Sequence, residues 1–222
     1  LFPNLFQGFL TETMVKRAQE KQLIEVVLVD FRLYALDKHK TTDDRPFGGG
    51  PGMVLKPEPI VTAVEKIITQ HPEAKIIMLS PQGKPYSQKI AEELASPSEA
   101  QLDRDIILLC GRYEGFDERI FEILKPIEIS IGDYVLSGGE VPAMVLIDSI
   151  MRLLPGALGC AESVKEDSFS DGVLDHPHYT RPPEYRGLKV PEVLISGDHE
   201  KIREWRLQKA IEKTKKNRND LL

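Results

Sequence analysis

The stretch Ile131-Gly-Asp-Tyr-Val-Leu-Ser-Gly-Gly-Glu140 decides the fold, because a short apolar segment runs directly into a turn punctuated by glycine. The apolar segment, residues 128–131, has the length and composition of a buried strand. In open α/β sheets, ligands bind beyond the carboxyl ends of the strands, which is where such a turn lies. The stretch therefore predicts a buried strand that ends at a ligand-binding turn.

Apolar runs and helical patterns alternate around this stretch. Four apolar runs are typical of short buried strands: Ile24–Val29, Lys75–Leu79, Ile106–Cys110 and Ile127–Ile131. Helical patterns lie at Thr11–Gln22, Pro59–Gln70, Ser87–Ala95 and Asp117–Leu124. A further helix is predicted over Val141–Leu154, and another from Asp198, which is placed to cap it, to about Lys216. This order predicts an α/β fold, with a mostly parallel sheet and helices on both faces.

The composition is that of an ordinary soluble protein. Hydrophobic residues make up 41% of the 222 residues and charged residues 29%. Asp148 and Arg152 interrupt the longest apolar run, so no membrane span is expected. Cys110 and Cys160 have neither CxxC partners nor the density of a disulfide scaffold, which predicts reduced thiols and a cytoplasmic location. Leu1-Phe-Pro is interpreted as the end of a strand that begins earlier.

The charge is unevenly distributed along the chain. Residues 181–222 carry 11 Lys and Arg against 7 Asp and Glu, whereas residues 1–180 carry 18 against 28. The net charge is therefore +4 on the tail and −10 on the body. A basic tail can supply a local phosphate-binding surface, although a solvated helix face has the same composition.

Small-residue loops follow three of the predicted strands. They are Ser80-Pro-Gln-Gly83, Gly111-Arg-Tyr-Glu-Gly115 and residues 132–139. Neither GxxxxGK[ST] nor a helix-opening GxGxxG occurs, so the glycine-rich residues 47–52 do not indicate a nucleoside triphosphate site. The loops instead suit a flat, mostly uncharged ligand, with Tyr86, Tyr134 and Leu136 as apolar walls and Glu114 as an acceptor for a ribose hydroxyl.

A second polar segment, residues 166–182, gathers carboxylates, imidazoles and an arginine. The irregular chain between the helix at 141–154 and about Pro183 is longer than an ordinary loop, which suggests a linker or a lid. Asp175, His176 and His178 lie close together in it, but His-Pro-His lacks the spacing of strong zinc motifs. The spacing alone therefore does not predict a transition-metal site.

Five motifs, in order along nearly the whole chain, resemble those of the bacterial tRNA (guanine-N(1)-)-methyltransferase family, TrmD. They are Asp44-Arg-Pro-Phe-Gly-Gly-Gly-Pro-Gly-Met53, Leu79-Ser-Pro-Gln-Gly83, Cys110-Gly-Arg-Tyr-Glu-Gly115, Ser130-Ile-Gly-Asp-Tyr-Val-Leu-Ser-Gly-Gly-Glu140 and Leu174-Asp-His-Pro-His-Tyr-Thr-Arg-Pro182. The resemblance implies a SPOUT fold, in which the carboxyl-terminal part of the sheet is threaded into a trefoil knot, and a homodimer that shares its active site between subunits. The family's opening strand is absent from this sequence, and many members continue beyond its end.

The resemblance also implies how the chain is divided. Residues 1–158 correspond to the domain that binds S-adenosylmethionine, residues 159–178 to a linker or lid with the catalytic aspartate, and residues 179–222 to a small helical tRNA-binding domain. The implied cofactor-binding residues are Tyr86, Gly111, Tyr113, Glu114, Ile131, Gly132, Asp133, Tyr134, Val135, Leu136, Gly138, Gly139 and Pro142. Members of the family are regarded as magnesium-dependent, but the sequence names no ligand set.

The implied reaction is methylation of the first ring nitrogen of the guanine 3′ to the anticodon, where another guanine precedes it. This nitrogen carries a proton at neutral pH, so a base must remove it and a cation must stabilise the charge that develops on the exocyclic oxygen. By motif, Asp167 is the base and Arg152 the cation. Without the resemblance, Asp167 is better explained as a helix cap and Arg152 as an ordinary helix-end cation.

Candidates for substrate contact are basic residues of the tail together with one carboxylate: Asp175, Arg181, Arg186, Arg203, Arg206 and Lys209. Three other interpretations stay open at this stage. They are a ribosomal RNA methyltransferase, a noncatalytic RNA- or ligand-binding module, and a metal hydrolase centred on the histidines.

Overall fold

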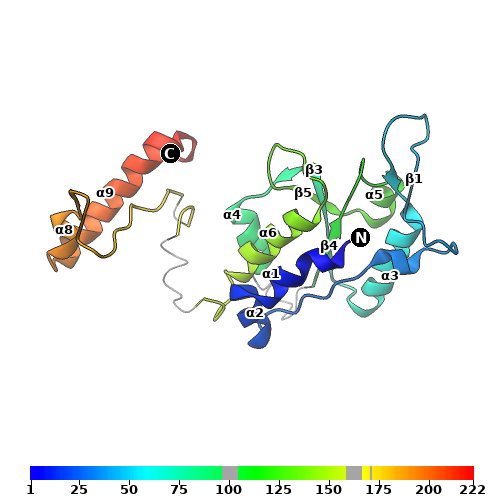
Figure 1. Ribbon diagram of the computed structural model, residues 1–222, viewed down its shortest axis with the longest axis horizontal. Coiled ribbons are helices and arrows are strands. Elements are labelled where there is room, and N and C mark those ends of the chain that lie inside the picture. Colours follow the sequence, from blue (N-terminus) through cyan, green and yellow to red (C-terminus); the bar gives the residue numbers. More distant parts are fainter. Residues whose placement is uncertain (97–104, 159–166, 171) are drawn as a thin grey trace. The chain divides into compact units, whose positions relative to one another are not determined.

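The computed structural model describes residues 1–96, 105–158, 167–170 and 172–222 (Figure 1). The chain divides into two compact units, residues 1–158 and 159–222. Each unit has its own arrangement of secondary structure. Within the described residues, no helix is both long and apolar enough to cross a membrane.

The first unit is built on a parallel three-stranded sheet. The central strand β3 (Lys75–Pro85) lies between β4 (Ile106–Cys110) and β5 (Ile127–Ser130). Lys75 is opposite Ile106 in one ladder, and Ile77 is opposite Ile127 in the other. The register shifts between Leu79 and Lys84, so the end of β3 bulges where its loop begins. The predicted parallel sheet is confirmed for these three strands.

Helices cover both faces of this sheet. Ile77 and Leu79 of β3 pack with α4 (Gln88–Ala95) and α6 (Glu140–Met151) in one cluster. Met78, which points to the opposite face, packs with α3 (Pro57–Gln70) and α5 (Arg119–Leu124) in another. The alternation of strand side chains therefore gives each face its own apolar core. These four helices match the predicted ones to within three residues at each end.

The amino-terminal helical region is broken rather than continuous. It consists of the 3-10 helix η1 (Pro3–Phe6), α1 (Gln7–Thr11) and α2 (Thr13–Glu20). Glu12 has an extended backbone, with φ of −124° and ψ of 163°, and this separates α1 from α2. Val15 and Ala18 of α2 pack against Met151 at the end of α6.

The prediction of a strand over Ile24–Val29 is wrong. In the structure, these residues belong to no strand, and the 3-10 helix η2 (Phe31–Tyr34) follows them. A largely apolar cavity of about 1650 Å³ is lined both by this segment and by β4. Among the described residues β4 pairs with β3 alone, so the segment borders the same cavity as β4 without joining its ladder and lacks the partner that a strand needs.

A short hairpin carries the glycine-rich residues 47–52. Strand β1 (Asp43–Asp44) pairs antiparallel with β2 (Val54–Leu55). At the end of β2, the backbone of Leu55 joins the loop after β4, because its amide donates to the Gly115 carbonyl at 2.9 Å. The hairpin is thereby attached to one of the three small-residue loops.

The second unit contains one long helix together with several short elements. A two-residue hairpin, β6 (Glu184–Tyr185) and β7 (Leu188–Lys189), precedes the short α8 (Glu192–Ile195) and the long α9 (His199–Asn217), and η3 (Asn219–Leu221) ends the chain. Asp198 caps α9 as predicted, since its carboxylate accepts from the Lys201 amide at 3.2 Å. Leu174 joins the irregular segment to this helix, because its amide donates to the Thr214 hydroxyl at 2.9 Å.

Candidate active site

Three segments meet at the carboxyl edge of the sheet: the bulged end of β3 and the loops after β4 and β5. Residues 80–83, predicted as a loop, lie within β3, which continues to Pro85 instead of ending at Leu79. The Gly139 amide donates to the Gly111 carbonyl at 2.8 Å, and Arg112 forms an antiparallel bridge with Gly138. The loop after β3 is tied to β5 in the same way, because the Tyr86 amide donates to the Ser130 carbonyl at 2.7 Å. The cofactor-loop residues predicted from the sequence are therefore brought together by backbone hydrogen bonds within one unit.

Gly139 lies where only a residue without a side chain fits. A Cβ atom added there would be 2.6 Å from the Cys110 Cα atom and 2.8 Å from the Gly111 nitrogen. Both neighbours are backbone atoms of the loop after β4, so neither can rotate away. The glycine permits the close approach of the two loops, rather than simply making a turn flexible.

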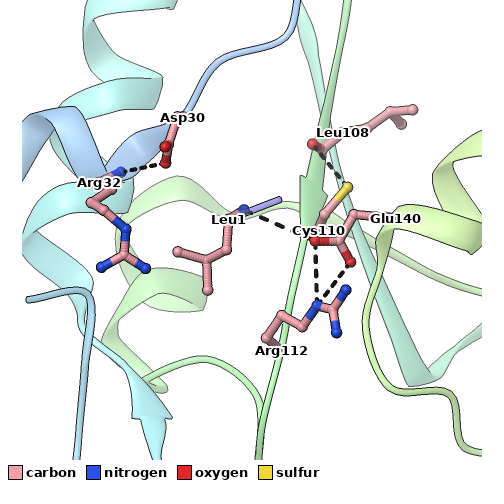
Figure 2. Close-up of polar contacts among 7 residues, drawn as sticks. All are labelled: Leu1, Asp30, Arg32, Leu108, Cys110, Arg112 and Glu140. Atoms are coloured by element: carbon pink, nitrogen blue, oxygen red, sulfur yellow. Dashed lines mark hydrogen bonds and ion pairs between the residues drawn. The ribbon is translucent and has the colours of Figure 1, made fainter. Parts of the chain in front are cut away.

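An ion pair between two side chains also joins these two loops (Figure 2). The Arg112 Nε atom lies 3.1 Å from Oε2 and 3.3 Å from Oε1 of Glu140, whose side chain is almost fully buried in the first turn of α6. The amino end of a helix favours a carboxylate, which supports the charge of Glu140. The Arg112 guanidinium also stacks over the Phe2 ring, 4.6 Å from its centroid.

Sequence reasoning did not single out Arg112 or Glu140. Both belong to quoted motifs, in Gly111-Arg-Tyr-Glu-Gly115 and at the end of the stretch that decides the fold. Opposite charges next to two glycine-rich turns were the available signal, but their pairing depends on the tertiary contact between the loops.

Cys110 ends β4 beside this ion pair (Figure 2). Burial, reinforced by the nearby Glu140 carboxylate, raises the pKa of its thiol to about 12, although the charges of the amino terminus and Arg112 act in the opposite direction. The thiol is therefore protonated throughout the physiological range. Cys110 is a packing residue rather than a nucleophile.

Tyr86 stands at the end of β3 and is anchored by its hydroxyl. This group lies 2.7 Å from the Ser149 hydroxyl on α6, which itself donates to the Val145 carbonyl at 2.7 Å. Burial raises the pKa of Tyr86, although the hydrogen bond with Ser149 opposes that effect. A fixed, neutral phenol ring suits the predicted role of an apolar wall.

The loop after β4 holds Tyr113 and Glu114 against the glycine-rich hairpin. The Glu114 amide donates to the Met53 carbonyl at 3.0 Å, and its side chain lies against Gly52, where a Cβ atom would collide with it. Tyr113 adopts a positive φ of 59°, and about half of its surface is exposed. The Glu114 carboxylate therefore has a defined place beside the three loops.

The loop after β5 is folded on itself and leaves apolar side chains at the surface. The Ser130 hydroxyl contacts both the amide and the carbonyl of Gly132, and the Tyr134 hydroxyl donates to the Ile131 carbonyl at 3.2 Å. Asp133 is exposed, and Pro142 is buried in the first turns of α6. Exposed apolar or aromatic side chains of this loop are those of Tyr134, Val135 and Leu136.

The two residues predicted to act on the base lie in different units. Arg152 caps the carboxyl end of α6 in the first unit and is exposed. Asp167 is exposed in the second unit, where its carbonyl accepts from the Ser170 amide at 3.3 Å. The intervening residues 159–166, which include Cys160 and most of the first half of the predicted lid, lie outside the described residues.

Asp175 is held close to the turn that begins at Asp167. Its amide donates to the Ser168 hydroxyl at 3.0 Å, and its carboxylate contacts His178 Nε2 at 2.6 Å and His176 Nε2 at 3.8 Å. Burial is the largest single influence and raises the pKa of Asp175. The hydrogen bond with His178 and the charges of both imidazoles together outweigh it, so the pKa lies below its ordinary value.

The predicted RNA-contact residues differ in how available their charges are. Arg181, Arg186, Arg203 and Arg206 are exposed, and the Arg186 guanidinium lies over the Tyr185 ring. Lys209 is partly buried, and its ammonium pairs with Glu212 at 2.5 Å, which lowers the pKa of that carboxyl. Tyr179 and Trp205 pack with ring centroids 6.3 Å apart. Lys209 is therefore the weakest of these candidates for binding phosphate.

Comparison with known proteins gives the family. The model of the tRNA (guanine-1)-methyltransferase TrmD family matches residues 1–222. The chain belongs to this family. A TrmD relative named tRNA (guanine-N(1)-)-methyltransferase, from Geobacillus kaustophilus, is 53% identical over 222 residues, which cover all of this chain and 88% of the relative. Relatives with the same name from Anoxybacillus flavithermus and Bacillus subtilis are 55% and 52% identical over 223 residues, and each is covered to 89%.

Membership of the TrmD family confirms the resemblance drawn from the five motifs. It also agrees with the α/β architecture, because the sheet and its three loops occupy the first unit of a chain that matches the family from end to end. The roles of individual residues stay predictions, as do the boundaries of the lid and of the tRNA-binding region.

Proposed function

We propose that this chain transfers a methyl group from S-adenosylmethionine to the first ring nitrogen of guanine in tRNA. The observation that supports this most is the linkage of three glycine-rich loops at the carboxyl edge of the sheet, in a chain that belongs to the TrmD family. In parallel sheets this edge is where ligands bind. Family membership favours tRNA over ribosomal RNA as the acceptor and a transferase over a noncatalytic module.

The proposed cofactor site lies among the loops after β3, β4 and β5. The Tyr86 ring and the exposed side chains of Tyr134, Val135 and Leu136 would contact the flat adenine ring and the methyl donor, and Glu114 would accept a hydrogen bond from a ribose hydroxyl. The backbone of residues 131–139 would supply further polar contacts. The proposed fold for this region is a trefoil knot, in which the cofactor is held bent.

Asp167 and Arg152 are proposed to divide the chemistry at the target base. Asp167 removes the proton from the ring nitrogen as the methyl group is transferred, and Arg152 stabilises the negative charge that develops on the exocyclic oxygen. Asp175 lies in the same folded turn as Asp167, because its amide is bonded to Ser168. It is therefore placed to assist in recognising the base.

No magnesium ligand is assigned in this proposal. It prefers a set of oxygen ligands and keeps several of its waters. Among the described residues, the one group of three side chains able to ligate a metal together offers one carboxylate and two imidazoles. That set does not fit magnesium, so the step of methyl transfer is derived from protein side chains alone.

The proposed partner is a tRNA, bound by a homodimer. The target is the guanine 3′ to the anticodon when another guanine precedes it, turned out of the loop so that the site can reach it. Exposed arginines of the second unit would bind phosphates. Support for a dimer comes from α6, where the apolar side chains of Val141 and Val145 are exposed.

The decisive experiment is methyl transfer from labelled S-adenosylmethionine to unmodified tRNA. The tRNA is used with the guanine 3′ to the anticodon and with adenine in its place. Wild-type protein should modify only the first, and Asp167→Ala should lower the rate by about 10²–10⁴-fold, as expected for loss of a general base. Asp220→Ala is the matched control, because it removes an exposed carboxylate of the same unit, which pairs with Arg218.

Each alternative gives a different result. Transfer that persists in Asp167→Ala would move the base to Asp175. Binding of S-adenosylmethionine without any transfer would indicate a noncatalytic module, and transfer to ribosomal RNA but not to tRNA would change the substrate.

A further inference from the structure

Three side chains of the second unit turn their ligating atoms toward one another. His178 Nε2 lies 2.6 Å from Oδ2 of Asp175, and His176 Nε2 lies 3.8 Å from the other carboxylate oxygen, Oδ1. The two imidazole rings are 4.4 Å apart between centroids. One ligating atom from each residue lies within 4.8 Å of the others. One carboxylate thus stands between two imidazoles.

We propose that Asp175, His176 and His178 form a binding site for one transition-metal dication of the Zn²⁺ type. Two imidazoles and a carboxylate are ligands that Zn²⁺, Ni²⁺ and Cu²⁺ accept readily. A zinc site with three protein ligands keeps its fourth position for water. His178 lies on the exposed side of the cluster, so water can reach a bound ion there.

The side chains need to move to form a filled site. Ligands about 2.0–2.1 Å from zinc lie about 3.3–3.4 Å from each other at the tetrahedral angle, so a separation of 4.8 Å must shrink by roughly 1.5 Å. The closest pair, His178 and Asp175, must open by roughly 0.7 Å. His178 is exposed, so its ring can rotate without disturbing a packed core.

The backbone that carries these ligands is fixed before any ion arrives. The Asp175 amide donates to the Ser168 hydroxyl at 3.0 Å, and the Asp175 carbonyl accepts from the Lys213 ammonium at 3.0 Å. The preceding amide, of Leu174, donates to the hydroxyl of the buried Thr214. The bonds to Lys213 and Thr214 hold the segment that carries the three proposed metal ligands against α9. A segment fixed in this way loses less conformational entropy when a metal ion binds.

Lys213 brings a positive charge to the same loop, which opposes a dication. Its ammonium, however, donates to the backbone carbonyl of Asp175 and not to the carboxylate. The two carboxylate oxygens face the imidazoles instead. The Lys213 charge therefore lowers the affinity for a dication, but Lys213 does not occupy either carboxylate oxygen.

A simple histidine–aspartate pair does not account for the whole cluster. His71 and Asp105 make such a pair, also at 2.6 Å. Within the described parts of the chain, only the group at Asp175 adds a second imidazole, whose Nε2 faces the other carboxylate oxygen. The His71–Asp105 pair thus offers a comparison inside the same molecule.

The test is calorimetric titration of Zn²⁺ into the full chain, first freed of metal by a chelator, with neither RNA nor S-adenosylmethionine present. One site per chain is expected, with an affinity on the order of micromolar. The double variant His176→Asn/His178→Asn should bind at least about tenfold more weakly. His71→Asn is the matched control and should bind like the wild type. Far-ultraviolet circular dichroism verifies that each variant folds.

Two further readouts separate this site from others. Co²⁺ should give visible absorption bands with the wild type that disappear with the double variant, and Asp175→Asn should weaken binding in the same titration. Excess Mg²⁺ should not displace Zn²⁺. The absence of saturable Zn²⁺ binding, unchanged binding by the double variant, loss of binding in His71→Asn, or displacement by Mg²⁺ would each overturn the proposal. Because no methyl transfer is measured, the outcome is independent of the proposed reaction.

Discussion

At the scale of single residues, Glu140 carries a buried charge whose partner comes from another loop. Its carboxylate is held by Arg112 and by the first turn of α6. Glu140→Gln removes the charge but keeps the shape, which leaves the guanidinium without its anionic partner. We expect the free energy of unfolding to fall by about 1–3 kcal/mol. Binding of S-adenosylmethionine should also weaken, because the loop holding Tyr113 and Glu114 is no longer fixed.

Urea unfolding and calorimetric titration of S-adenosylmethionine measure the two effects. Glu20→Gln is the matched control, since its pair with Lys16 is an exposed one at i,i+4 spacing. That variant should lose less than about 0.5 kcal/mol. Equal losses for the two variants would show that the buried pair has no special part in holding the loops together.

Gly139 supports a second prediction at this scale. In Gly139→Ala the new methyl group meets the backbone of Cys110 and Gly111, so the loops must separate. We expect a loss of about 1–3 kcal/mol in unfolding free energy, as for overpacked positions, and weaker binding of S-adenosylmethionine. Gly8→Ala in α1 is the control, because nothing lies within 4 Å of the added atom. It should be neutral or stabilising by up to about 1 kcal/mol. A Gly139→Ala protein as stable as Gly8→Ala would rule out the close contact between the loops.

At the scale of elements, α9 presents cations that differ in their partners. Arg203 and Arg206 are exposed on this helix, whereas the Lys209 ammonium is already paired with Glu212. Glu replacements at Arg203 and Arg206 should therefore weaken tRNA binding strongly and reduce its salt dependence, whereas Lys209→Gln should have a smaller effect. Binding is measured by filter retention at several salt concentrations. An unchanged affinity and salt slope in the double charge reversal would remove α9 from the RNA surface.

The elements also show where sequence reasoning succeeds. Strand β4 has the predicted bounds, and α9 begins at the predicted cap, because a compact apolar run and an Asp side chain act locally. Ile24–Val29 has an equally apolar composition, yet it belongs to no strand. Strand formation depends on actual pairing with a neighbour, and whether a segment pairs cannot be deduced from the segment itself.

The candidate sites, too, could be predicted only in part from the sequence. The loops after β4 and β5 could be predicted, since each follows a recognisable strand and contains glycine, whereas the predicted loop at residues 80–83 is a bulge within β3. The Arg112–Glu140 pair could not, because 28 positions separate its members and the contact between the loops creates it. The spacing of Asp175, His176 and His178 gave no support for a metal site, because an extended segment does not fix side-chain directions as a helix does. Hydrogen bonds to Ser168, Lys213 and Thr214 bring that loop into its final form.

At the scale of the whole molecule, the proposed catalytic residues belong to separate units, Arg152 to residues 1–158 and Asp167 to residues 159–222. A homodimer can combine the first unit of one subunit with the second unit of the other. Mixing Arg152→Ala with Asp167→Ala, after mild denaturation and refolding, tests this arrangement. If each site takes Arg152 from one subunit and Asp167 from the other, half of the dimers are mixed and each has one intact site. We therefore expect about a quarter of the wild-type transfer activity. If both residues come from the same subunit, no mixed dimer has an intact site and the activity stays at the level of the separate variants. Refolded wild type is the control for recovery, and mixing without denaturation shows how fast the subunits exchange.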